Sequence, residues 1–160
     1  MVASFTGTLA RRLLAWALGS VVLGVALLVA ADGFWRGFGL QAGLWGLIDS
    51  VIALVALRSA RAEAGAAHPG GGSADLAAHE IARSRRIARI LWLNTGLDVV
   101  YVAVGAALVA VAGSTDPFLA GNGWGVIVQG GFLLVFDLVH ALRVPTPDGP
   151  VTDRVRQPPG

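Results

Sequence analysis

Residues 123–142 read GWGVIVQGGFLLVFDLVHAL, and this stretch decides the class of the fold. A helix needs roughly 20 predominantly apolar residues to cross about 30 Å of hydrocarbon, and the stretch has that length. It is too long for an ordinary β-strand, and glycine within such a segment is common in transmembrane helices. We therefore predict a membrane-spanning helix that carries Gln129, Asp137 and His140 into the bilayer.

Three further stretches have the same character and cover residues 13–31, about 37–57, and 90–112. The composition agrees, because the chain is 55% apolar and only 14% charged, whereas soluble domains carry about 25% charged residues. We predict an all-α membrane protein, in which residues 1–143 form one domain, a bundle of four transmembrane helices.

The first stretch has a second interpretation. Arg11 and Arg12, an apolar core and the small residues Ala30 and Ala31 resemble a secretory signal peptide with its cleavage site. The apolar core is longer than the roughly 7–15 residues that are usual for such a signal. We therefore expect this helix to be retained.

The arginines predict the orientation of the bundle. Eleven of the twelve lie before the first span, between the second and third, or after the fourth, and only Arg36 lies on the other side. Basic residues accumulate in cytoplasmic loops, so we expect both termini and the middle loop in the cytoplasm. Because the net charge is only +2, we expect the lipid bilayer as a partner and no nucleic acid.

The segments outside the spans have their own composition. Residues 62–75 contain HPGGGS and read as a flexible cytoplasmic linker, whereas residues 76–89 favour a helical extension of the third span. Residues 144–160 contain five prolines and are predicted to form a disordered cytoplasmic tail.

The two halves of the chain share a pattern of polar residues. Gln41 precedes Asp49 by the same spacing as Gln129 precedes Asp137. If this match reflects an internal duplication, each unit is a two-helix hairpin, and the two tandem hairpins form a parallel repeat about the membrane normal.

Acidic residues within the predicted spans are the strongest functional clue, because a charge in hydrocarbon is costly unless it is partnered, neutralised or hydrated. Asp49 and Asp98 each lie nine residues from an inner arginine, and Asp137 lies six residues from Arg143. These spacings correspond to roughly 13 Å and 9 Å along a helix. The three acids therefore share the inner half of the bilayer, as a common site requires.

Other polar residues join this layer. On the third helix, Asn94, Asp98 and Tyr101 follow the spacing of one helical face. On the fourth, Asp137 and His140 are three residues apart and can touch. The predicted intramembrane site is thus a set of eight residues: Asp49, Asp98, Asp137, Gln41, Gln129, Asn94, Tyr101 and His140.

Three interpretations of this layer stay open. Its side chains can hydrogen-bond between helices and only hold the bundle together, each bond contributing about 0.6 kcal/mol. They can form a route for protons or cations, or a pocket for a ligand, a lipid or a partner protein. Their spacing selects no metal, nothing indicates a cofactor, and no nucleophile-base pair indicates an enzyme. Small residues at Ser20, Gly24, Gly39 and Gly43 predict close helix approach.

Two segments resemble motifs of an uncharacterised family of small four-pass bacterial membrane proteins. They are Leu97-Asp98-Val99-Val100-Tyr101, with Asn94 upstream, and residues 129–140, QGGFLLVFDLVH. The resemblance covers the second to fourth spans best and the first weakly. It implies a four-helix bundle in a bacterial inner membrane and brings no activity with it.

We therefore expect a non-enzymatic integral membrane protein whose polar interior binds a ligand or supports assembly with a membrane partner or a second copy of the chain. The alternative is a small proton- or ion-coupled transporter. Because four helices enclose little room for a substrate path, such a transporter would act as a homo-oligomer.

Overall fold

The computed structural model describes residues 2–65, 73–113 and 115–145. These residues form the helices α1 (Val2–Ala30), α2 (Gly33–Gly65), α3 (Ser73–Ala112) and α4 (Pro117–Ala141), and no strand occurs among them. All four helices are long and apolar enough to cross a membrane. The predicted all-α fold is confirmed, and by the length and composition of its helices the chain is a multi-pass membrane protein.

The helices extend beyond the predicted spans. α1 begins at Val2 and α3 at Ser73, while α2 continues to Gly65 and takes up the start of the predicted linker. Hydropathy marks only the apolar part of a helix, whereas the backbone hydrogen bonds continue into polar sequence. The centre of the predicted linker, residues 66–72, and the predicted tail beyond residue 145 lie outside the described residues.

Short turns join the helices in pairs. Gly33, at φ 52°, starts α2 directly after the two residues that follow α1, and Gly113, at φ 51°, ends α3. Glycine adopts this left-handed conformation without a steric penalty. Asp116 then caps α4, because its carboxylate accepts a hydrogen bond of 2.9 Å from the Leu119 amide, and Pro117 occupies the first turn.

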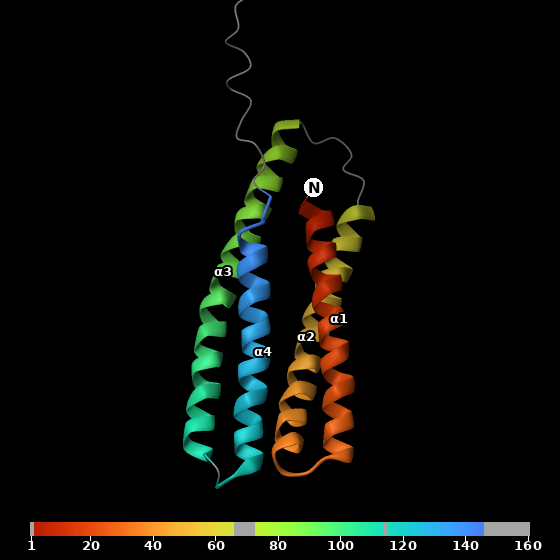
Figure 1. Ribbon diagram of the computed structural model, residues 1–160. Coiled ribbons are helices and arrows are strands. Elements are labelled where there is room, and N and C mark those ends of the chain that lie inside the picture. The colour runs from red at the N-terminus through yellow and green to blue at the C-terminus, as the bar shows by residue number, and fades with distance from the viewer. Residues whose placement is uncertain (1, 66–72, 114, 146–160) are drawn as a thin grey trace, which may run out of the picture.

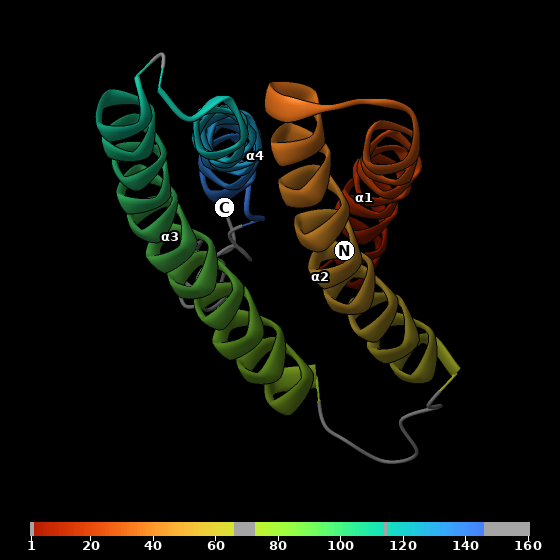
Figure 2. The same cartoon turned by 90° about the horizontal axis from the view of Figure 1, so that it is seen from below.

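The bundle consists of two hairpins that meet through their second helices. α1 packs on α2, α3 packs on α4, and α2 packs on α4. Viewed along the bundle, the order is therefore α1, α2, α4, α3 (Figure 2). α4 is the most enclosed helix, since 44% of its most apolar window is buried, against 22% or less in the others.

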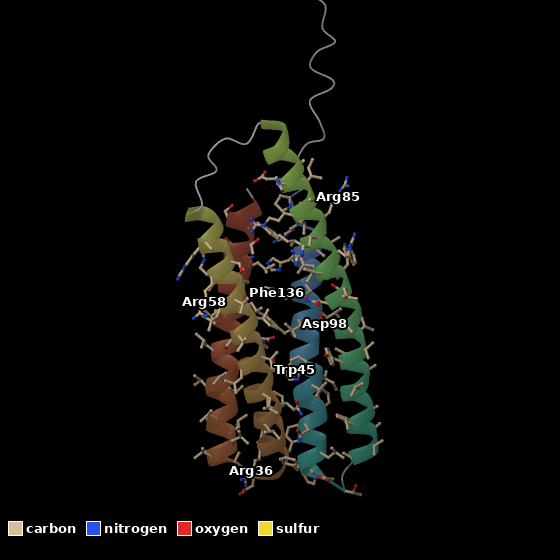
Figure 3. All side chains as sticks on the ribbon, turned by 180° about the vertical axis from the view of Figure 1, so that it is seen from behind. Arg36, Trp45, Arg58, Arg85, Asp98 and Phe136 are labelled. Atoms are coloured by element: carbon tan, nitrogen blue, oxygen red, sulfur yellow. The ribbon has the colours of Figure 1, made fainter. Side chains whose placement is uncertain are left out.

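The two ends of the bundle differ in charge. Both hairpin turns lie at one end, which we call the turn end, and the N-terminus and the start of α3 lie toward the other (Figure 1). Arg36 lies at the turn end, whereas Arg58 and Arg85 lie toward the opposite end, which we call the basic end (Figure 3). The charge asymmetry of the sequence is thus an asymmetry along the bundle axis.

Different contacts hold the hairpins together along their length. In the first hairpin a Cβ on Gly24 would lie 2.4 Å from the Gly43 nitrogen and 2.7 Å from the Gly39 oxygen. The predicted close approach of these small residues is confirmed. Farther along the bundle Leu13, Ala53 and Phe136 form a buried apolar cluster that joins α1, α2 and α4.

Candidate functional site

The three predicted acids meet in one cavity. Asp49 of α2, Asp98 of α3 and Asp137 of α4 line a chamber of about 250 Å³. Their side chains are almost fully enclosed, with exposed fractions of 2%, 3% and 7%. Three separate helices therefore bring acidic groups to one cavity, which we call the acidic chamber. Figure 3 shows Asp98 in the central part of the bundle.

The chamber satisfies only part of its own hydrogen-bonding capacity. Asn94 also lines it, one helical turn from Asp98 on α3. The Oδ2 atoms of Asp49 and Asp98 are buried and have no hydrogen-bond partner in the part of the chain that the structure describes. An ionised carboxylate in that situation is costly, so these oxygens call for a proton, a cation or water.

An aromatic pair forms another wall of the chamber. Trp45 and Tyr101 line the cavity and meet edge to face, with ring centroids 4.9 Å apart and planes at 73°. The faces of such rings attract cations, most strongly where water is excluded. Acidic groups beside aromatic rings form an environment that favours a positively charged guest.

The chamber opens on the outer surface of the bundle. Ile48, Ile52 and Leu97 line it and yet are 49%, 53% and 46% exposed. They belong to α2 and α3, which form no extended contact with each other because each packs on α4. These side chains lie within the apolar segments of their helices, so the mouth of the chamber is surrounded by apolar surface.

The two predicted glutamines lie outside the chamber. Gln41 donates to Asn122 Oδ1 at 3.0 Å, and Asn122 in turn donates to the Phe118 carbonyl at 2.8 Å. Gln129 accepts from Trp16 Nε1 at 2.9 Å and donates to Ser20 Oγ at 3.1 Å. Both glutamines therefore join helices of different hairpins, and within the described residues their amides already have partners.

His140 also lies outside the chamber, although it is only three residues from Asp137. Its Nδ1 donates to the Phe136 carbonyl at 2.6 Å, and its ring lies 4.2 Å from that of Phe136. Its Nε2 is buried and has no hydrogen-bond partner among the described residues. His140 therefore makes no hydrogen bond to Asp137 and belongs to another part of the α4 surface.

Sequence reasoning missed the residues that complete the glutamine contacts. Asn122 lies one residue before the predicted fourth span, and Trp16 lies near the start of the first. Ser20 was predicted only as a small packing residue. No local sequence pattern predicts these hydrogen bonds, because each glutamine bonds to a residue of the other hairpin.

The arrangement of the acids bears on what the chamber can hold. Among the described residues, no group of three or more His, Cys, Asp or Glu side chains is close enough to hold a metal ion. No arginine within the described ranges lines the chamber, and the chain contains no lysine. The three acids line one cavity, so any two of them that are ionised together would repel each other. A guest with one positive charge would relieve this repulsion.

A family of unknown function (DUF6992) matches residues 12–138, which include every residue that lines the acidic chamber and part of each of the four helices. The match thus extends into the first helix, where only a weak resemblance was expected. No curated protein and no solved structure is detectably similar to the chain. Because the match covers most of its length, the chain belongs to the DUF6992 family.

Proposed function

We propose that this chain is a non-enzymatic membrane protein whose acidic chamber binds a small organic cation, a protonated amine with an apolar body. The observation that carries the proposal is the convergence of Asp49, Asp98 and Asp137 on one cavity, with two of their oxygens lacking a hydrogen-bond partner. A binding pocket offers convergent polar groups within apolar walls, and this chamber has both.

The size and lining of the chamber favour this ligand class. The chamber volume of about 250 Å³ is below the roughly 300–1,000 Å³ of pockets for drug-sized ligands, which restricts the guest to a small molecule. An ammonium group would lie near the carboxyl groups, and its apolar body would contact Trp45, Tyr101 and the aliphatic side chains at the mouth. Because the mouth is edged by exposed apolar residues, such an amine would enter sideways from the bilayer.

A binding measurement with a matched acid tests this proposal. We would titrate the purified protein in detergent with phenethylammonium and, separately, with the neutral 2-phenylethanol, using isothermal titration calorimetry. Wild type should prefer the ammonium. Asp98→Asn should weaken the binding of phenethylammonium at least tenfold, or by about 1.4 kcal/mol. Asp32 is an exposed acid in the turn between α1 and α2, and Asp32→Asn should leave this binding unchanged. Equal affinity for both compounds, or equal effects of both substitutions, would contradict a cation site.

Proton- or ion-coupled transport is the second candidate function, favoured by the partnerless oxygens of Asp49 and Asp98. At the turn end α2 and α4 are in backbone contact: a Cβ on Gly37 would lie 2.1 Å from the Phe118 oxygen. Passage in that direction would therefore require the two helices to separate. Reconstituted vesicles that show no flux under a pH gradient or an amine gradient would exclude this alternative and leave the binding proposal intact.

We also propose that the protein lies in a bacterial inner membrane with its basic end in the cytoplasm. The support is the separation of Arg36 from Arg58 and Arg85 along the bundle (Figure 3) and the preference of basic residues for the cytoplasmic side.

A further inference from the structure

A second group of polar side chains lies at the basic end, between the start of α1 and the end of α4. Arg12, Arg143 and His140 line a hollow of about 370 Å³ together with Thr8. No residue of this hollow lines the acidic chamber. It is therefore a separate site of opposite charge.

The hollow has a donor-rich lining with unused capacity. Neither Arg12 nor Arg143 forms an ion pair that the structure records within residues 2–65, 73–113 and 115–145, and both are exposed. His140 is 6% exposed, and its partnerless Nε2 is buried at the edge of the hollow. Because Nδ1 donates to the Phe136 carbonyl, Nε2 is an acceptor in the neutral ring, so the donors of the hollow are the two guanidinium groups. Guanidinium groups bind phosphate through paired, charge-assisted hydrogen bonds, so this lining favours a phosphate group.

An apolar groove continues directly from the hollow. Its volume is about 400 Å³, it shares Arg12 and His140 with the hollow, and it runs past Trp16, Phe132 and Val135. Trp16 stacks on Phe132 with ring centroids 3.7 Å apart and planes at 8°, which gives the groove a flat floor. Trp16 is four residues deeper in α1 than Arg12, or about 6 Å along the helix. The groove thus leads from the charged end into the apolar depth of the bundle.

We infer that this α1–α4 site binds an anionic phospholipid, with its phosphate at Arg12 and Arg143 and one acyl chain along Trp16 and Phe132. A charged hollow continuous with an apolar groove matches the two chemistries of one lipid molecule. Basic residues next to a transmembrane helix attract anionic lipids, and a shaped pocket between helices adds selectivity. This inference does not rest on the proposed cation site.

Native mass spectrometry of the detergent-solubilised protein tests the inference. We would add dioleoylphosphatidylglycerol or the zwitterionic dioleoylphosphatidylcholine in equal amounts and compare the bound fractions. Wild type should retain the anionic lipid about tenfold more strongly. The double variant Arg12→Gln/Arg143→Gln should lose this preference, whereas Arg58→Gln/Arg86→Gln, which removes the same charge from exposed positions outside the site, should keep it.

Two further measurements distinguish a bound lipid from a bound inorganic anion. Val135→Trp would fill the groove from an exposed position without changing charge, and it should reduce retention of the anionic lipid several-fold. Excess inorganic phosphate should not displace the lipid. Equal loss in both arginine double variants, full retention in Val135→Trp, or displacement by inorganic phosphate would each overturn the inference; the last would indicate a site for the free anion.

Discussion

The turn end and the basic end of this bundle are held together in different ways. Toward the turn end the backbones of α2 and α4 touch, since a Cβ on Gly121 would lie 1.9 Å from the Phe34 oxygen. Toward the basic end, side chains such as Phe136 lie between the helices, and the apolar groove and the acidic chamber open beside this cluster. One half of the bundle is thus closely packed, and the other contains cavities.

Residue size explains this difference. Without a hydrophobic driving force between helices in lipid, close backbone approach through small residues is a main source of cohesion. Gly37, Gly121 and Gly125 supply it between α2 and α4. Beyond Gly131, where a Cβ would meet nothing within 4 Å, the α4 sequence turns to bulky residues and Asp137. An apolar cluster that includes Leu13 and Phe136 lies between the acidic chamber and the apolar groove.

The largest expected difference between the two ends is in their accessibility from outside the cell, which should be complete at one end and absent at the other. The chain has no cysteine, so a single one can be introduced at exposed Thr115 near the turn end or at exposed His79 near the start of α3. Added to intact cells, a membrane-impermeant maleimide should label Thr115→Cys and not His79→Cys. Labelling of both sites after the cells are opened is the control, and the reverse pattern would invert the proposed orientation.

The next effect concerns cohesion at the turn end. Gly121→Ala should destabilise the protein by about 2–3 kcal/mol, because its Cβ would overlap the α2 backbone. Gly131→Ala is the matched control on the same helix, where a Cβ would meet nothing within 4 Å. Unfolding by denaturant in detergent measures both. If the two variants unfolded together, the glycine contact would not hold the hairpins together.

A smaller effect is expected for the glutamines that join the hairpins. Gln129→Leu removes hydrogen bonds to Trp16 and Ser20, and Gln41→Leu removes the bond to Asn122. At about 0.6 kcal/mol for each bond, the expected losses are about 1 and 0.6 kcal/mol. The same unfolding assay measures them. A larger loss for Gln41→Leu would contradict this ordering of the contacts.

The smallest effect on stability is expected in the acidic chamber. Asp98→Asn replaces a side chain with a partnerless oxygen by an amide of the same shape, so the free energy of unfolding should change by less than about 0.5 kcal/mol. The substitution should nevertheless weaken the binding of an organic cation. Destabilisation comparable to that of Gly121→Ala would instead mark the chamber as a structural element.

Much of the fold follows from local sequence. The apolar stretches predict the helices, and the spacing of Asn94, Asp98 and Tyr101 predicts a face that the structure turns toward the chamber. Local sequence could not, however, predict that the glutamines and the aspartates have different surroundings. Gln129 and Asp137 lie on one helix with similar polarity, yet the first is hydrogen-bonded to α1 and the second lines the chamber. The internal duplication stays a prediction.

Helix crossing explains why the sequence could not make that distinction. The period of a helix fixes which residues share a face, whereas the angle and offset between helices fix which neighbour that face meets. His140 illustrates this limit of sequence-based prediction. It is only three residues from Asp137, yet it lies beside α1 and outside the chamber.

Local sequence thus determined four apolar helices, the charge difference between their ends and the position of each acid along its helix, because hydropathy, charge and helical rise are properties of one segment. The packing of α2 on α4 decided that the acids share a cavity, that this cavity opens between α2 and α3, and that the arginines at the basic end adjoin an apolar groove. Those features arise only where helices far apart in the chain approach one another, so their physical cause is tertiary.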